Sequence, residues 1–242
     1  MQRIKYRILG CPCLAMRETD AATQMIALIE EKKAGYTVAI NAEKIQRFDT
    51  DPLMRNIILG SILPYPDGAG AVLGLKWLFD VDAEKINMPI TALAVADKAK
   101  LRVFIIGADE KNHELAVKRI AETYRNIQLV GHLHGFEARE LMLSEVLTTK
   151  PQIILIAMGS PKQEVVAAEL MAEANFGLAV GCGGALDILS GSVRRAPTIM
   201  VNNNLEWLYR LYKNPWRIQR QLVLPKFLIR LVVECFKRKV ID

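Results

Sequence analysis

Short apolar runs alternate with longer amphipathic stretches along most of the chain. Apolar runs predict buried strands at residues 37–40, 102–106, 127–130, 153–157 and 177–180. Helical spacing of apolar residues predicts helices between them, for example at 114–124, 137–149 and 162–174. Strands that alternate with helices of this length predict an α/β fold, with a mostly parallel sheet and helices on both faces. Ligands of such sheets bind beyond the carboxyl ends of the strands.

The alternation stops near Arg194, which predicts a core domain at residues 1–193 and a helical C-terminal appendage at 194–242. From Pro225 onward, apolar residues recur at helical spacing and basic residues occupy another face. This pattern predicts a basic amphipathic helix. Its apolar positions are Phe227, Leu228, Leu231, Val232, Cys235 and Phe236, and its basic positions are Lys226, Arg230 and Lys237.

The positive charge of the chain is concentrated in this appendage. The whole sequence has a net charge of +6. Residues 194–242 contain eleven basic and three acidic residues, a charge of +8, which leaves −2 for the first 193 residues. A basic segment on a nearly neutral body predicts an anionic partner, which could be a phosphate ligand, a nucleic acid or a membrane surface.

Composition excludes several classes of protein. With 51% hydrophobic and 24% charged residues, the chain is not disordered as a whole. No uncharged apolar run reaches 18 residues, so we expect no membrane-spanning helix, and the polar start of the chain does not resemble a secretory signal. The four cysteines are scattered without a zinc-binding pattern, which predicts a reduced, cytosolic chain.

Polar residues follow two of the apolar runs. Asn41 comes directly after the strand predicted at 37–40, where it can cap a helix or orient a ligand. Asp67 lies in the glycine-rich turn 66–70. Its carboxylate could act as a general base towards a hydroxyl, or it could simply form the turn. The local sequence leaves both alternatives open.

The strand predicted at 153–157 also runs into a helix start. Ser160 can cap this helix, Pro161 suits its first position, and the free amides there favour anionic or polar ligand groups. Lys162 and Gln163 add more polar groups than an ordinary turn requires.

Residues 180–187 come close to a dinucleotide-binding fingerprint, but Leu186 breaks the pattern and no acidic strand end follows. A nucleotide diphosphate near the amides of Gly183 and Gly184 is the alternative to a dinucleotide. Asp187 could then pair with a base or a ribose.

The remaining polar clusters give weaker signals. The Asp-x-Asp triplets at 49–51 and 80–82 could hold a metal, but their polar surroundings favour solvated surface. We infer no metal-ligand geometry for the histidines and treat them as structural or surface residues: His113, His132 and His134. In the appendage, arginines interleave with aromatic residues, which suits either phosphate binding or packing of the aromatics on the core. These arginines are Arg210, Arg217 and Arg220.

In this order, the motifs resemble the WecG/TagA/CpsF family of bacterial glycosyltransferases. The matching motifs are Asn-Ala-Glu-Lys at 41–44, Pro-Asp-Gly at 66–68, Gly-Ser-Pro-Lys-Gln-Glu at 159–164, Gly-Gly-Ala-Leu-Asp at 183–187, Arg-Ala-Pro at 195–197 and Leu-Glu-Trp-Leu-Tyr-Arg at 205–210. The first and third are most similar to those of members that transfer N-acetylmannosaminuronic acid.

The resemblance implies a Rossmann-like core with a C-terminal appendage, and an inverting reaction that needs no metal or other cofactor. The implied donor is a UDP-linked sugar of the N-acetylmannosamine type. The implied acceptor is undecaprenyl-diphosphate-linked N-acetylglucosamine at the cytoplasmic face of the cell membrane. The basic amphipathic end would then meet anionic lipid, as in a peripheral membrane protein.

The resemblance also assigns roles by position. It implies that Asp67 is the catalytic base and that Asn41 lies in the active-site pocket. Gln163 and Asp187 would contact the donor nucleotide. The three appendage arginines would close over the site and meet the diphosphate. No nucleic acid is implied, and a homo-oligomer is possible.

The sequence departs from the family pattern at two places. Ala39 stands where many members have Thr, and Lys85 with residues 88–91 replaces an Arg and a Gly-x-Asp-Leu-like run. These differences bear on the choice of sugar, so another UDP-hexose such as UDP-glucose is one alternative. A dehydrogenase-like module and a nucleic-acid binder are the others, and the motif-rich, nearly neutral body argues against both.

Overall fold

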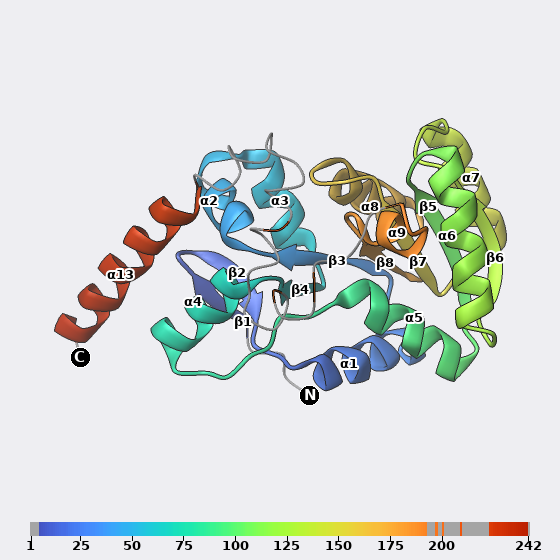
Figure 1. The fold of residues 1–242 in the computed structure, drawn as a ribbon. Helices are drawn as coiled ribbons and strands as arrows, with labels where there is room; N and C mark the ends of the chain where they lie inside the picture. Colours follow the sequence, from blue (N-terminus) through green and yellow to red (C-terminus); the bar gives the residue numbers. More distant parts are fainter. Residues whose placement is uncertain (1–4, 193–196, 198–199, 201–208, 210–222, 242) are drawn as a thin grey trace.

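The computed structural model describes residues 5–192, 197, 200, 209 and 223–241 (Figure 1). Within these residues, six strands form a parallel sheet in the order β4-β3-β8-β7-β5-β6. Their bounds are β3 Gly35–Ile40, β4 Leu63–Pro66, β5 Arg102–Gly107, β6 Gln128–Leu133, β7 Ile153–Ala157 and β8 Leu178–Gly181. The predicted α/β fold with a parallel sheet is confirmed.

Helices cover both faces of this sheet, as predicted (Figure 1). One face packs against α1 (Glu18–Glu30), α5 (Met88–Ala99), α6 (Glu110–Thr123) and α9 (Ala185–Leu189). The other packs against α2 (Ala42–Thr50), α3 (Pro52–Gly60), α7 (Arg139–Thr149) and α8 (Lys162–Glu173). Successive residues of β5 point to opposite faces of the sheet. Val103 and Ile105 pack on the first face, and Phe104 and Ile106 pack on the second.

Several element boundaries differ from the sequence prediction. The strand predicted at 127–130 continues to Leu133, and the helix predicted at 114–124 begins at Glu110. The helix starts early because the Asp109 side chain accepts a hydrogen bond from the Asn112 N–H at 3.1 Å and caps it. The helix predicted at 137–149 begins later, at Arg139.

The N-terminal part of the described chain is an antiparallel hairpin that the sequence did not predict. It consists of β1 (Lys5–Ile8) and β2 (Cys11–Leu14). The turn residues Leu9 and Gly10 have φ angles of 48° and 88°, the left-handed pair that suits a two-residue hairpin turn. α4 (Ala69–Phe79) packs against this hairpin so closely that a Cβ atom on Gly74 would lie 2.6 Å from the Ile8 side chain.

The last described helix, α13 (Val223–Ile241), packs against α2 and α4 (Figure 1). The helix predicted from Pro225 is confirmed, but its apolar residues do not share one environment, because Phe227 and Leu231 are fully buried in the protein core. Arg230, expected on the basic face, forms an ion pair with Asp49 and a hydrogen bond with Gln46. The exposed apolar residues of the helix are Leu228, Ile229, Val232, Val233 and Phe236.

Two further features bear on the expected organisation. Among the described helices, none combines the length and apolar character needed to cross a membrane. The boundary between residues 193 and 194 stays a prediction, since most of the following 30 residues lie outside the part of the chain that the structure describes.

Candidate active site

Four neighbouring strands, β4, β3, β8 and β7, place their carboxyl ends at one edge of the sheet, because all of them are parallel. Asn41 directly follows β3 and Asp67 directly follows β4. Gly183 follows β8, and Ser160 follows β7. The sheet therefore brings together four motifs that are distant in the sequence, at the edge where ligands of such folds bind.

Asp67 forms the turn between β4 and α4. Its N–H donates to the carbonyl of Ile40 at 2.8 Å, which ties the turn to the end of β3. Gly68 follows with a φ angle of 96°, which glycine adopts without strain. The carboxylate is half-buried, so the residue that shapes the turn can also meet a ligand. Asp67 can therefore form the turn and still act as a base, so the two roles left open by the sequence do not exclude each other.

The carboxylate of Asp67 stands close enough to Tyr65 to influence its ionisation. Tyr65 is buried, and burial raises the pKa of its hydroxyl well above the ordinary value. The negative charges of the Asp67 and Glu164 carboxylates raise this pKa further. The phenol therefore stays protonated at neutral pH and cannot compete with Asp67 as a base.

Asn41 caps α2, because its side-chain oxygen accepts a hydrogen bond from the Lys44 N–H at 3.0 Å. The capping role expected from the sequence is confirmed. Among the described residues only this oxygen is engaged, so the amide nitrogen of the side chain can serve a ligand.

A chain of buried polar contacts connects three of the strand ends. The Lys44 ammonium lies 2.7 Å from Glu164 Oε1, and both side chains are about 95% buried, with exposed fractions of 5% and 3%. Gln163 Nε2 donates to the same oxygen of Glu164 at 3.1 Å. Gln163 Oε1 accepts from the Gly183 N–H at 2.8 Å. The loops after β3, β7 and β8 are therefore held together beneath the site.

The sequence did not reveal Lys44 and Glu164 as part of this network. Burial by itself would raise the pKa of the Glu164 carboxyl, but the Lys44 charge and hydrogen bonds from Lys44, Gln163 and Ser160 outweigh it and lower this pKa. The signal in the sequence was weak: Lys44 stands directly before the apolar Ile45, and Lys44 and Gln46 are the polar residues of this helix that are buried. The pairing of Lys44 with Glu164 follows from the order of β3, β8 and β7 in the sheet, which the sequence does not show.

Residues 6–240, nearly the whole chain, match the family described as Glycosyl transferase WecG/TagA/CpsF family. The chain belongs to this family. As a WecG/TagA/CpsF glycosyltransferase, it is a transferase that needs a sugar donor and an acceptor.

One expectation about the glycine-rich loop of this glycosyltransferase changes with the structure. Gly183 has a φ angle of 54° and gives its N–H to Gln163, so that amide is not available to a diphosphate while Gln163 stays in place. Gly184 is exposed, and a Cβ atom there would lie 3.6 Å from Asp187 Oδ2. The Asp187 carboxylate therefore lies next to the exposed part of the loop. A direct contact of Gln163 or Asp187 with a nucleotide stays a prediction.

The predicted cap at Ser160 is wrong. α8 begins at Lys162 with Pro161 in the cap position, and no side chain caps it. The Gly159 carbonyl instead accepts the N–H of Gln163 at 2.8 Å. Lys162 is exposed, donates to the Gly135 carbonyl at 3.1 Å, and has its ammonium 5.8 Å from the centre of the Phe136 ring.

Other expected site residues are distributed as follows. The three arginines of the appendage, Arg210, Arg217 and Arg220, lie outside the described residues. The 49–51 triplet is not simply solvated: Asp49 pairs with Arg230, and Asp51 caps α3 and pairs with Arg47. The 80–82 triplet is exposed as predicted, and both of its carboxylates pair with Lys76.

The histidines also differ from the expectation. His113 is buried, and its Nε2 lies 3.0 Å from Nδ1 of His132, although we inferred no common geometry for them. Burial lowers the pKa of His113. Helical and strand periodicity did not show this contact, because it joins α6 to β6.

Proposed function

We propose that the chain is an inverting glycosyltransferase that moves an N-acetylmannosamine-type sugar from UDP to undecaprenyl-diphosphate-linked N-acetylglucosamine. Family membership supports the transferase class. The observation that carries the proposal is the position of Asp67, a half-buried carboxylate at the carboxyl end of β4 that is tied to the end of β3 just before Asn41.

In this mechanism the Asp67 carboxylate accepts the proton of the acceptor hydroxyl. The oxygen of that hydroxyl attacks the anomeric carbon of the donor sugar. The new C–O bond forms while the bond to UDP breaks, and UDP leaves with the electron pair. Attack from the side opposite UDP inverts the anomeric configuration. Asn41 is suited to orient one of the sugars through its side-chain amide.

The departing diphosphate requires compensating charge or hydrogen-bond donors. We assign this role to Arg210, Arg217 and Arg220 and, among the described residues, to Lys162 and the exposed start of α8 near Ser160. Asp187 and the Gly184 loop are assigned to the nucleotide. Gln163 acts as a positioning residue, since its amide is used by Gly183 and Glu164. The proposal includes no metal and no other cofactor.

We further propose that the protein works at the inner face of the cell membrane. Its acceptor carries a long lipid chain, and α13 exposes apolar side chains together with Lys226 and Lys237. Such a surface suits an interface with anionic lipid headgroups. The same apolar side chains could instead contact a second copy of the chain.

A donor panel tests the reaction. We would incubate the protein with UDP-hexoses, a short-chain prenyl-diphosphate N-acetylglucosamine acceptor and EDTA, and measure UDP release and the anomeric configuration of the product. We expect acceptor-dependent release from an N-acetylmannosamine-type donor, with inversion. Release from UDP-glucose alone would favour the alternative donor. A protein that binds no UDP would contradict the proposal altogether.

Replacement of the base tests the mechanism. In Asp67→Asn the side chain keeps its shape but cannot accept the proton, so we expect kcat to fall about 10²–10⁴-fold. The dissociation constant of UDP should stay unchanged. The control is Asp82→Asn, because Asp82 is an exposed carboxylate that pairs with Lys76. Equal turnover of wild type and Asp67→Asn would show that another group takes the proton.

A further inference from the structure

Three side chains with metal-binding atoms meet where α6 lies against β6, at the edge of the sheet opposite β4. They are His113 and Glu114 on α6 and His132 on β6, and one ligand atom of each lies within 4.8 Å of the other two. We propose that these residues form a binding site for a single Zn²⁺ ion. The inference does not depend on the proposed function, because none of the three residues belongs to the candidate active site.

The distances between the ligand atoms suit a zinc ion. Nε2 of His113 lies 3.0 Å from Nδ1 of His132, which lies 3.9 Å from Oε1 of Glu114. In tetrahedral zinc sites, ligand atoms about 2.0–2.1 Å from the metal are about 3.3–3.4 Å apart. Small side-chain shifts would therefore bring all three atoms to bonding distance. The side chains of His132 and Glu114 can shift in this way because both are exposed.

His113 is held in the orientation that a zinc ligand needs. Its ring is 1% exposed, and its Nδ1 lies 2.8 Å from the carbonyl oxygen of Gly107. A carbonyl can only accept, so Nδ1 carries the proton and Nε2 presents its lone pair towards His132. Metal-binding histidines are commonly fixed by such a hydrogen bond from the other ring nitrogen.

The carbonyl that fixes this ring belongs to a rigid part of the fold. Gly107 ends β5 with a φ angle of 130°, and a Cβ atom there would lie 2.2 Å from the Ala157 carbonyl oxygen. The close approach of these two strand ends leaves Gly107 little room to move. His113 is therefore a preorganised ligand, and the two exposed residues can close around the ion.

Binding has a simple proton balance. Without metal, Nδ1–H of His132 donates to Nε2 of His113. A zinc ion takes the place of this proton on Nδ1, and His132 takes up a proton from solvent on Nε2, so it binds as a neutral imidazole and no net proton is released. The Glu114 carboxylate and a water molecule complete four ligands. Two imidazoles with one carboxylate suit zinc better than magnesium or calcium, which prefer oxygen ligands alone. The ion would join α6 to the edge strand β6.

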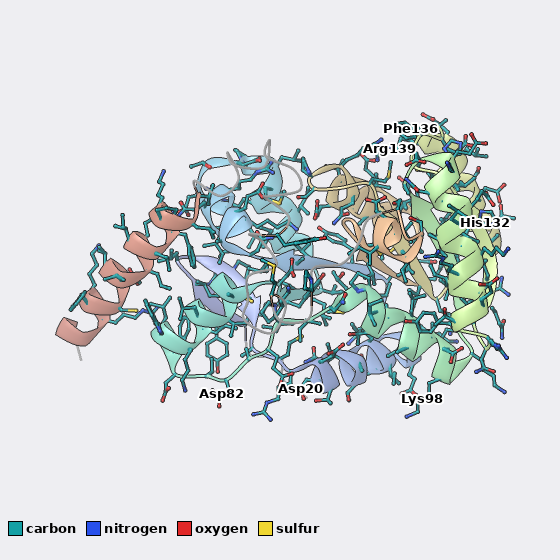
Figure 2. All side chains as sticks on the ribbon, viewed as in Figure 1. Asp20, Asp82, Lys98, His132, Phe136 and Arg139 are labelled. Atoms are coloured by element: carbon teal, nitrogen blue, oxygen red, sulfur yellow. The ribbon has the colours of Figure 1, made fainter. Side chains whose placement is uncertain are left out.

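Figure 2 shows His132 at the outer edge of the molecule, beside α6. The nearby His134 provides a matched control, because its Nε2 lies 3.1 Å from Glu137 without belonging to the three-ligand cluster. The test uses full-length, untagged protein that has been treated with EDTA and then dialysed. Zn²⁺ is titrated by calorimetry, and Co²⁺ is titrated by visible absorption, since tetrahedral Co²⁺ absorbs strongly.

We expect one Zn²⁺ per chain, and an increase in thermal midpoint of about 5–10 °C when zinc is present at 100 times its dissociation constant. His132→Asn and Glu114→Gln should each weaken binding about tenfold or more, while His134→Asn should bind like wild type. Both changed ligands are exposed, so these variants should fold normally.

Absence of saturable zinc binding would overturn the proposal. Equal affinity in wild type and the three variants would overturn it as well. Asp67→Asn should bind zinc like wild type, so a failure of the proposed reaction leaves this test intact.

Discussion

Lys44 and Glu164 form an ion pair away from water, next to the loops that carry the candidate active site. Their charged atoms lie 2.7 Å apart. A buried charge is tolerated when a partner compensates it, and the loss of one partner costs more than the loss of both. Through Gln163 and Gly183, the same pair fixes the loops after β7 and β8.

Removal of one partner should therefore destabilise the fold. We expect Lys44→Met to lower the free energy of unfolding by about 3–5 kcal/mol, because the Glu164 carboxylate stays buried without its partner. Lys44→Met combined with Glu164→Leu should recover most of this loss. Urea unfolding at neutral pH measures the free energy of unfolding of the single and the double variant. A single variant as stable as wild type would show that water reaches the carboxylate.

The pair also predicts a dependence of stability on pH. The pKa of Glu164 is lower in the folded protein than the value of 4.5 expected for the unfolded chain. Its contribution to stability is therefore complete above the unfolded pKa and is lost as the pH falls towards the folded pKa. Between about pH 5 and pH 3, wild type should lose more stability than the double variant. If the free energy of unfolding fell equally with pH in wild type and in the double variant, Glu164 would not be the group responsible.

At the residue scale, the sequence predicted which residues follow the strands but not what they contact. Asn41 and Asp67 were found because polar residues after apolar runs mark strand ends. The bond between Gln163 and Gly183 could not be predicted, since it depends on the adjacency of β7 and β8. The burial of Lys44 is likewise a tertiary property, because hydrophobic periodicity alone assigns a lysine to the surface.

At the scale of elements, strands with long apolar runs were predicted well and short or proline-containing strands were not. β7 has the predicted bounds because it is buried on both faces. β4, with the sequence Leu-Pro-Tyr-Pro, was seen only as an apolar run, and it tolerates proline because it is an edge strand. β6 was predicted too short because its residues are only half-buried at the other edge.

The attachment of α13 gives a prediction at the same scale. Phe227 is fully buried, and its ring lies 3.3 Å from where a Cβ atom on Gly70 would be, three residues after Asp67. Phe227→Ala should cost about 3–5 kcal/mol and increase hydrogen exchange along α13. Ile229→Ala is the control, since Ile229 is 66% exposed and its loss should change stability by less than about 0.5 kcal/mol. Unchanged exchange in Phe227→Ala would mean that other contacts hold the helix.

At the scale of the whole molecule, α13 and β6 lie at opposite ends (Figure 1). α13 presents an apolar surface that includes Val232 and Phe236, next to Trp77 of α4. On the side of β6 lies the exposed Phe136, labelled in Figure 2, whose ring centre is 5.8 Å from the Lys162 ammonium. The proposed membrane contact therefore belongs to one end of the molecule.

Flotation with vesicles tests this asymmetry. Ile229→Ser with Phe236→Ser should reduce binding to anionic vesicles without loss of fold, because both side chains are 66% exposed. Leu115→Ser, which changes an exposed apolar residue of α6, should bind like wild type. Equal vesicle binding by all three proteins would contradict the membrane contact. A change in sedimentation of the double variant alone would instead assign the surface to a second copy.

The order of the strands also has a consequence for synthesis on the ribosome. β3 and β4 pair early in the chain, and β5, β6 and β7 pair later. In the sheet as described, the four residues of β8 join the two groups. During translation, β3 must wait for β8 for a time on the order of ten seconds. Until then, one side of β3 is an open edge that a chaperone or a neighbouring nascent chain can reach. Slow codons between β7 and β8 should therefore lower the yield of soluble protein more than slow codons after β8.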